Sequence, residues 1–370
     1  MLDIIPFPPL VTLFGRQFSL YQRCWYGFLT AFLTGLAIGE PVIKFLIRHR
    51  IHQIFRPRQQ VHNLAILHGP KAGVPTMGGV IVLLASFAAM ALWAAFNDLV
   101  IVTIIIYLAC TALGALDDAM KLIKGNSKGL TSWQKLLVHG LITYLLWRIV
   151  AKNPLLDNLI TQVNWRWFVA KFSPGNALVV IFIFYFFVIA GTSNAVNLTD
   201  GVDGLAITNV IQCLVFFCVI AFYSRNVNVA GKSLLTYIAG AGELAVLCAC
   251  FAGGSLAFFR FNLSPAFVFM GDMGAIGLGG LLAIIAILLR QPFVLLLIGS
   301  TFVIEAISVT LQVASKRLFR RKIFLMAPLH HHFELKGYSE HTIVGVVFIW
   351  QAICLGIAFY ITFYEYFKSP

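Results

Sequence analysis

Carboxylates at the ends of apolar segments are the residues of this sequence best able to do chemistry. Asp117 and Asp118 are adjacent and follow the apolar run 113–116, and Asp272 stands between Gly271 and Met273. A negative charge is disfavoured at the C-terminal end of a helix, so two adjacent carboxylates there call for a cation. Oxygen ligands without cysteine suit Mg²⁺, which binds through one or two carboxylates together with substrate phosphates. The alternative for any one aspartate is a helix cap, which contributes about 1 kcal/mol.

A second acidic motif is Asn197-Leu-Thr-Asp200-Gly-Val-Asp203. Its amide and its two carboxylates are spaced three residues apart. On a helical turn this spacing places them on one face, as residues three apart are neighbours there. We therefore expect these three side chains to act together.

Two further segments are suited to anions. His330, His331 and His332 are consecutive, and helical neighbours point about 100° apart, so the three cannot all face one zinc from a helix. Contacts with phosphate or sugar are favoured over a zinc site. Lys71 and Thr76 lie in a loop rich in glycine and proline that leads into a helix N-terminus, which is a ready site for an anion.

The elements that must position these residues are membrane helices. Hydrophobic residues make up 60% of the chain and charged residues only 11%, against roughly 25% charged in a typical soluble domain. Apolar runs of about 20 residues, the length that crosses a bilayer as a helix, recur ten times. The expected spans are 24–47, 76–96, 98–116, 133–151, 177–192, 205–223, 235–259, 274–289, 292–314 and 342–366. We predict an all-α, polytopic protein with a single transmembrane domain over 1–370.

The positive charges predict the orientation of these spans. When loops are assigned alternately to two sides, one side holds 16 of the 27 lysines and arginines, and the positive-inside rule makes that side cytoplasmic. Both termini are then periplasmic, and the aspartates described above fall at the cytoplasmic face. The net charge of +13 is dispersed over short loops, which points to lipid headgroups and phosphates and argues against nucleic acid. Three acids, Glu40, Glu243 and Glu305, lie within apolar spans, where ionisable groups are suspected of function.

Several motifs together resemble those of one family. They are Pro75-Thr-Met-Gly-Gly79, Asp117-Asp118, the stretch from Gly191 to Asp203, Phe269-Met-Gly-Asp272, and the stretch from Ala327 to Gly337 with its three histidines. In these motifs the chain resembles the phospho-N-acetylmuramoyl-pentapeptide translocases, the lipid I synthases of the polyprenyl-phosphate N-acetylhexosamine-1-phosphate transferase superfamily. The resemblance implies an enzyme of the bacterial inner membrane with ten transmembrane helices. It also implies a Mg²⁺-dependent transfer of phospho-N-acetylmuramoyl-pentapeptide from its UDP conjugate to undecaprenyl phosphate, which gives lipid I and UMP.

The resemblance also implies roles for single residues. Asp272 would ligate Mg²⁺, Asp117 would engage or deprotonate the lipid phosphate, and Asp118 would support them. Phe269 would stack on uracil, and the catalytic group would include His331. The remaining substrate contacts would come from Lys71, Thr76, Lys128, Asn194, Asn197, Asp200, Asp203, Asn262, His330 and His332. Direct attack by the lipid phosphate and attack through a covalent intermediate both use the same carboxylates, so both stay open.

Two other readings are weighed against this one. A related transferase that uses another UDP-sugar would share the carboxylate motifs, but its members lack the full His-His-His-Phe-Glu-Leu-Lys-Gly stretch found here. A divalent-cation transporter would also need intramembrane acids, but those should line the middle of the membrane. A homodimer is consistent with the resemblance, and the sequence indicates no interface for it.

Overall fold

Apart from one bridge between His52 and Pro75, every regular element in the described residues is a helix. The computed structural model describes residues 18–52, 73–126, 129–150, 152 and 174–368. The helices are α1 (Leu20–Arg48), α3 (Gly79–Trp93), α4 (Asp98–Lys124), α5 (Ser132–Val150), α7 (Pro174–Thr199), α8 (Leu205–Ser224), α9 (Val227–Gly231), α10 (Ala241–Asn262), α11 (Gly271–Leu288), α12 (Pro292–Ile298), α13 (Ser300–Leu318), α14 (Leu329–Leu335) and α15 (Glu340–Lys368).

Membrane-spanning helices make up most of the bundle. Among the described residues, seven helices are long and apolar enough to cross a bilayer, and the pair α12 and α13 adds an eighth if it forms one span. The ten apolar runs expected from the sequence each coincide with a helix or with this pair. Two of them, α3 with 15 residues and α5 with 19, fall outside the seven, so their crossing of the membrane stays a prediction.

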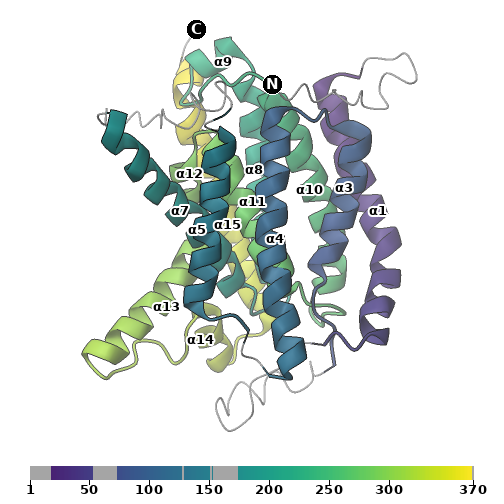
Figure 1. Cartoon of the computed structure of the whole chain (residues 1–370), viewed down its shortest axis with the longest axis vertical. Helices are drawn as coiled ribbons and strands as arrows, with labels where there is room; N and C mark the ends of the chain where they lie inside the picture. Colours follow the sequence, from purple (N-terminus) through teal and green to yellow (C-terminus); the bar gives the residue numbers. More distant parts are fainter. Residues whose placement is uncertain (1–17, 53–72, 127–128, 151, 153–173, 369–370) are drawn as a thin grey trace.

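The expected continuous helix over 292–314 is wrong in one respect. The structure breaks this run at Gly299, and α12 and α13 meet there at 83°. Gly299 caps both helices with φ −105° and ψ 22°, which interrupts the run of helical hydrogen bonds. As a result α13 leans out of the bundle, away from its neighbours (Figure 1).

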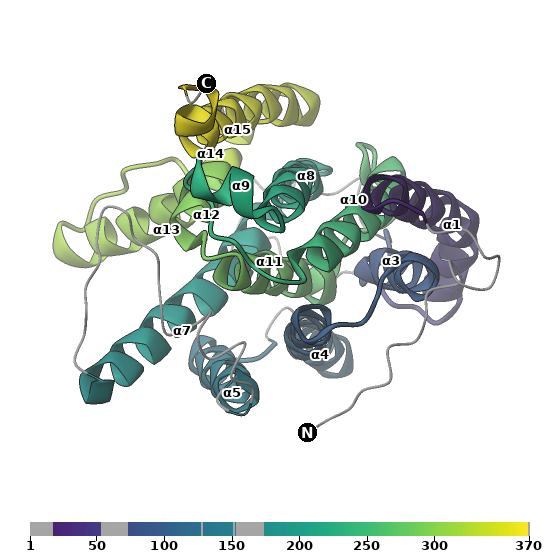
Figure 2. The same ribbon diagram turned by 90° about the horizontal axis from the view of Figure 1, so that it is seen from above.

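The centre of the bundle is α11, which packs against α4, α7, α8 and α3 (Figure 2). All of its residues from Gly274 to Leu288 are buried, as expected for a helix that is apolar on every side. Small residues let its neighbours approach closely. A Cβ atom at Gly277 would lie 2.3 Å from Oγ1 of Thr111 on α4, and one at Gly279 would lie 2.6 Å from Cα of Ser193 on α7. This packing sets the start of α11 beside the acidic end of α4.

The bundle has two different ends. The first residues of α1 and the last of α15 lie at one end, and the last turn of α4 lies with α14 at the other (Figure 1). Large apolar side chains such as Leu33, Leu141 and Ile349 are exposed on the outside of the bundle. Such an apolar outer surface is expected where lipid, and not water, surrounds the helices.

Candidate active site

Asp117 and Asp118 lie inside α4, about two turns before its end at Lys124. The helix runs further than the expected span, which ended at residue 116, and it stops where Gly125 adopts φ 60°. Both side chains are buried, with Asp117 0% and Asp118 4% exposed. Two buried carboxylates on adjacent positions require cations or hydrogen-bond donors nearby.

Asp272 occupies the first turn of α11, where the helix dipole favours a negative charge. The neighbouring N–H group of Met273 donates to Oδ2 of Asp118 at 3.0 Å, so Asp118 also caps this helix. Gly271 has φ +73°, and a Cβ atom there would lie 2.7 Å from Oδ2 of Asp118 and 2.8 Å from Oγ1 of Thr76. A glycine is therefore needed for α11 to begin this close to α4.

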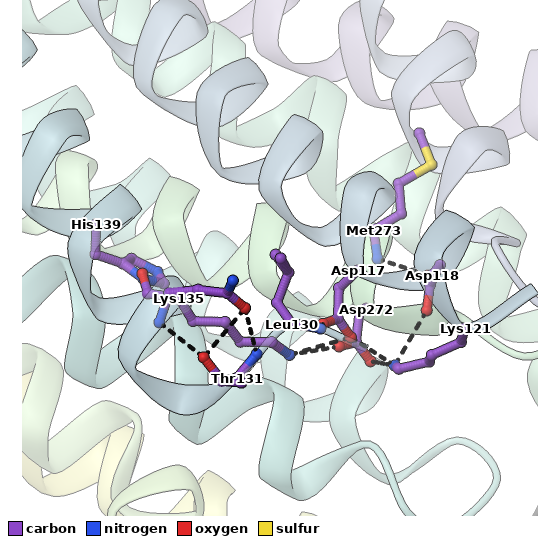
Figure 3. Close-up of polar contacts among 10 residues, drawn as sticks. Asp117, Asp118, Lys121, Leu130, Thr131, Lys135, His139, Asp272 and Met273 are labelled. Carbon is purple, nitrogen blue, oxygen red and sulfur yellow. Dashed lines mark hydrogen bonds and ion pairs between the residues drawn. The ribbon is translucent and has the colours of Figure 1, made fainter. Parts of the chain in front are cut away.

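The three aspartates form one cluster, in which one carboxylate oxygen of each lies within 4.8 Å of the others. Two lysines bridge them (Figure 3). The Nζ atom of Lys121 is 2.8 Å from Asp117, 3.4 Å from Asp118 and 2.9 Å from Asp272. The Nζ atom of Lys135, on α5, is 3.2 Å from Asp117 and 2.9 Å from Asp272.

Asp117 joins this cluster to the start of α5. Its Oδ1 accepts the N–H of Leu130 at 2.6 Å, and a Cβ atom at Gly129 would lie 2.4 Å from the same oxygen. The glycine lets the backbone close over the carboxylate. Asp117 thus fixes the segment that brings Lys135 to the cluster.

The donor set of this cluster fits a hard divalent cation. Three carboxylates supply oxygen ligands only, and among the described residues the two lysines paired with them, Lys121 and Lys135, balance two of the three negative charges. Mg²⁺ prefers oxygen ligands of this kind. The cluster could therefore hold a metal ion.

The acidic motif at 197–203 is not one helical turn, which corrects the expectation from its spacing. Helix α7 ends at Thr199, a turn follows, and α8 begins at Leu205 after Gly204 with φ +81°. Burial, together with the nearby carboxylates of Asp272, Asp118 and Asp203, raises the pKa of Asp200 to about 8. Asp200 therefore lies within electrostatic reach of the cluster.

Asp203 and Asn262 tie this turn to the segment before α11. Oδ2 of Asp203 accepts the N–H of Ala266 at 3.1 Å. The buried amide of Asn262 accepts the N–H of Gly204 at 3.0 Å and donates to the carbonyl of Val268 at 2.9 Å. Contact of either residue with a substrate stays a prediction, since these bonds show a positioning role.

Thr76 and Phe269 meet at the edge of the cluster. Phe269 donates its N–H to the carbonyl of Pro75 at 2.8 Å, and Gly78 donates to the carbonyl of Phe269 at 2.8 Å. Thr76 is buried and Phe269 is half-buried. The side chains of Asn194 and Asn197 are half-buried, and the amide of Asn194 donates to the carbonyl of Ala190. Two predicted substrate residues, Lys71 and Lys128, lie outside the described residues.

The three histidines lie on α14 and have different partners. Nδ1 of His330 is 3.4 Å from Glu305, and Nδ1 of His331 is 2.5 Å from Glu334. Nδ1 of His332 accepts the N–H of Leu325 at 3.1 Å. Each of the three rings thus has a partner of its own.

The glutamates within apolar spans also have partners. Glu243 pairs with Arg23, and Glu40 pairs with Lys44 in an exposed i,i+4 contact. The carboxylate of Glu305 accepts the N–H of Leu329 at 2.5 Å. Each of the three therefore has a partner within the described part of the chain.

Comparison with known proteins places this site in a family. The model of the family described as "Glycosyl transferase family 4" matches residues 99–290, a range that includes the three clustered aspartates and also Asp200 and Asp203. A protein of Vesicomyosocius okutanii subsp. Calyptogena okutanii (strain HA), named phospho-N-acetylmuramoyl-pentapeptide-transferase, is 36% identical over 353 residues. The match covers 93% of this chain and 94% of that protein.

The chain belongs to the phospho-N-acetylmuramoyl-pentapeptide-transferase family. This confirms the resemblance read from the motifs. A member of this family is a multi-pass membrane transferase of peptidoglycan synthesis, and the reading as a cation transporter is set aside.

Two residues of this transferase site were missed by the sequence reasoning. From the sequence, Lys121 and Lys135 were counted only among the 16 positive charges of the side predicted to be cytoplasmic. The i,i+4 spacing of Asp117 and Lys121 was a usable signal, because such pairs face each other on a helix. Lys135 carries no such signal, because only the packing of α5 against α4 brings it to the cluster.

Proposed function

We propose that this protein transfers phospho-N-acetylmuramoyl-pentapeptide from UDP to undecaprenyl phosphate, forming lipid I and UMP at the cytoplasmic face of the bacterial inner membrane. The observation that carries the proposal is the buried cluster of Asp117, Asp118 and Asp272 at one end of a membrane bundle. A lipid-borne phosphate and a water-soluble nucleotide can meet at such an end. The named activity of the 36% identical relative supports the same reaction.

In the proposed reaction, an oxygen of the lipid phosphate attacks the sugar-bearing phosphorus of the nucleotide. The bond from that phosphorus to the bridging oxygen breaks, and UMP leaves with the electron pair. Asp117 engages the lipid phosphate or takes its proton. Its place beside Lys121 and Lys135 suits this role, since the two ammonium groups attract an anionic lipid phosphate to the carboxylate.

Asp272 is the proposed ligand of Mg²⁺, with Asp117 and Asp118 beside it. When bound, Mg²⁺ supplies neutralisation of the charge on the diphosphate. The chain's own contribution is then positioning and electrostatics, as is usual in phosphoryl transfer. Asp118 holds the start of α11 through Met273, so it keeps Asp272 in place.

The nucleotide is proposed to lie beside this cluster. Phe269 would stack on uracil, and the turn that carries Asp200 would face the ribose and the phosphates. The histidines of α14 would contact the phosphosugar. His330 lies beside the same turn, since a Cβ atom at Gly201 would lie 2.3 Å from its Nε2. Thr76 and Asn197 complete the proposed surroundings.

The proposed topology has ten spans, with α3 and α5 among them, and a single transmembrane domain. Both termini are proposed to be periplasmic. The start of α1 and the end of α15 lie at the end of the bundle opposite α14, which supports this arrangement (Figure 1). A homodimer is part of the proposal on family grounds alone.

The direct test is a transfer assay in detergent with purified protein, Mg²⁺ and undecaprenyl phosphate. We expect UDP-N-acetylmuramoyl-pentapeptide to yield UMP and a lipid-linked product in equal amounts, and we expect removal of Mg²⁺ by a chelator to stop both. A second reaction with UDP-N-acetylglucosamine tests the alternative transferase. Faster turnover of that sugar, or no turnover of either by folded protein, would contradict the proposal.

A further inference from the structure

Glu305 makes contacts at the start of the histidine-bearing helix. It lies in α13, is 4% exposed, and accepts the N–H of Leu329 at 2.5 Å and that of His330 at 3.2 Å. These are the first two N–H groups of α14, which have no partner within the helix itself. A buried carboxylate is thus satisfied by the backbone of the element that carries the histidines.

The same carboxylate lies against the ring of His330. Nδ1 of His330 is 3.4 Å from Oε1 of Glu305, and the ring is only 1% exposed. Both ring nitrogens are buried and have no hydrogen-bond partner among the described residues, so the 3.4 Å approach of Nδ1 to Glu305 is an electrostatic contact and not a hydrogen bond. A Cβ atom at Gly201 would lie 2.3 Å from Nε2, so this atom faces the turn between α7 and α8.

The charged groups around His330 come from three elements. Glu305 approaches from α13, and the turn between α7 and α8 carries Asp200, directly before Gly201, and Asp203, two residues after it. On α14, the ring of His331 is 4.2 Å away between centroids, and Glu334 is paired with His331. Glu305 is therefore the carboxylate on the Nδ1 side of His330.

We propose that Glu305 is a positioning residue that holds α14 in place and fixes the ring of His330, so that Nε2 is presented to the substrate over the 200–203 turn. The inference rests on the proposed function for the identity of that substrate, a sugar phosphate. The Glu305 carboxylate, 3.4 Å from Nδ1, is the charged group on that side of the ring and orients it, as the outer partner of a functional histidine does. Nε2 is then the ring atom left for the substrate.

The test compares Glu305→Gln with Glu243→Gln, a matched change of another carboxylate that accepts a backbone N–H, that of Ala95, but lies at the opposite end of the bundle. Glutamine can still accept an N–H of α14, but it removes the charge beside Nδ1. We expect Glu305→Gln to lower kcat about 10- to 100-fold with KM for the lipid phosphate nearly unchanged. Glu243→Gln should leave both values unchanged. In protein labelled with ¹⁵N-histidine, the nitrogen signals of His330 should move only in Glu305→Gln.

A second variant reaches His330 without touching Glu305. Gly201→Ala places a methyl group against Nε2, where the backbone has no positive φ to oppose alanine, so it should lower kcat and move the same signals. If both variants keep wild-type kcat and His330 signals, the inference is overturned. Should the wild type fail to release UMP, the proposed function falls, whereas the ¹⁵N signals still decide the role of Glu305.

Discussion

The two ends of the bundle treat buried charge in opposite ways. At one end Glu243 meets Arg23 in a two-pronged ion pair of 2.8 and 2.5 Å, and the arginine also donates to the carbonyl of Trp93. Each charge has one opposite partner. At the other end three carboxylates share Lys121 and Lys135, with Asp200 within electrostatic reach.

This difference separates a structural site from a chemical one. The ion pair of Arg23 and Glu243 also bonds the backbone after α3, so it holds α1, α10 and the end of α3 together. The two charges balance each other and require no ligand. The shared lysines leave a net negative charge in a buried place, which a divalent cation can relieve.

The largest effect is expected for Asp272→Asn. The change keeps the shape of the side chain and removes the charge of the proposed metal ligand. We expect kcat for UMP release to fall by about 100- to 1,000-fold, the usual cost of losing one electrostatic contact to a transition state. Activity within threefold of wild type would contradict the assignment.

The matched change at the other end is Glu243→Gln, which leaves Arg23 without its charge partner. Breaking a buried ion pair from one side costs about 3 kcal/mol, so the free energy of unfolding in a detergent titration should fall by that order. The kcat of folded protein should stay at the wild-type value. A loss of kcat without a loss of stability would remove the contrast between the two ends.

Lys135→Met sharpens the role of the shared lysines. Without this ammonium the cluster gains net negative charge, so Mn²⁺ used in place of Mg²⁺ should bind about tenfold more tightly or better. The same variant should lose kcat, because the lysine also attracts the lipid phosphate. Weaker Mn²⁺ binding, measured by electron paramagnetic resonance, would show that Lys135 supports the metal site and does not compete with it.

The sequence predicts much of this difference between the two ends. The features that it does not predict were missed for physical reasons. The apolar runs predicted the helices, and Asp117 and Asp118 were predicted to need a cation because carboxylates are disfavoured at the C-terminal end of a helix; the structure brings Asp272 into the same cluster. The kink at Gly299 was missed because hydropathy does not report helix direction. Lys135 was missed because its neighbours are set by packing between α4 and α5 and not by spacing.

Asp200 should make both the stability of the protein and its affinity for Mg²⁺ depend on pH. Its pKa of about 8 lies above the ordinary value, so the group is mainly protonated at pH 7 in the metal-free protein. Its contribution to stability is therefore complete below about pH 4 and is lost as the pH rises through 8. A bound cation favours the ionised form, so the apparent affinity for Mg²⁺ should rise about fivefold between pH 7 and pH 8. Asp200→Asn should flatten this rise, and calorimetric titrations at the two pH values measure it.

The smallest effect is expected at the exposed pair of Glu40 and Lys44, whose side chains are 69% and 73% exposed. Solvent screens such a pair, so Glu40→Gln should change neither stability nor kcat measurably. This variant is the baseline for the other four. A clear loss of activity would mean that this face of α1 takes part in the reaction.

The central claim is that the aspartate cluster binds a divalent cation, and a metal titration tests it most directly. We would titrate Mn²⁺ into wild type, Asp272→Asn and Glu243→Gln and count bound ions by electron paramagnetic resonance. We expect one tight ion in wild type and in Glu243→Gln, displaced by Mg²⁺, and its loss in Asp272→Asn. Equal binding by all three proteins would contradict the assignment of the metal to this cluster.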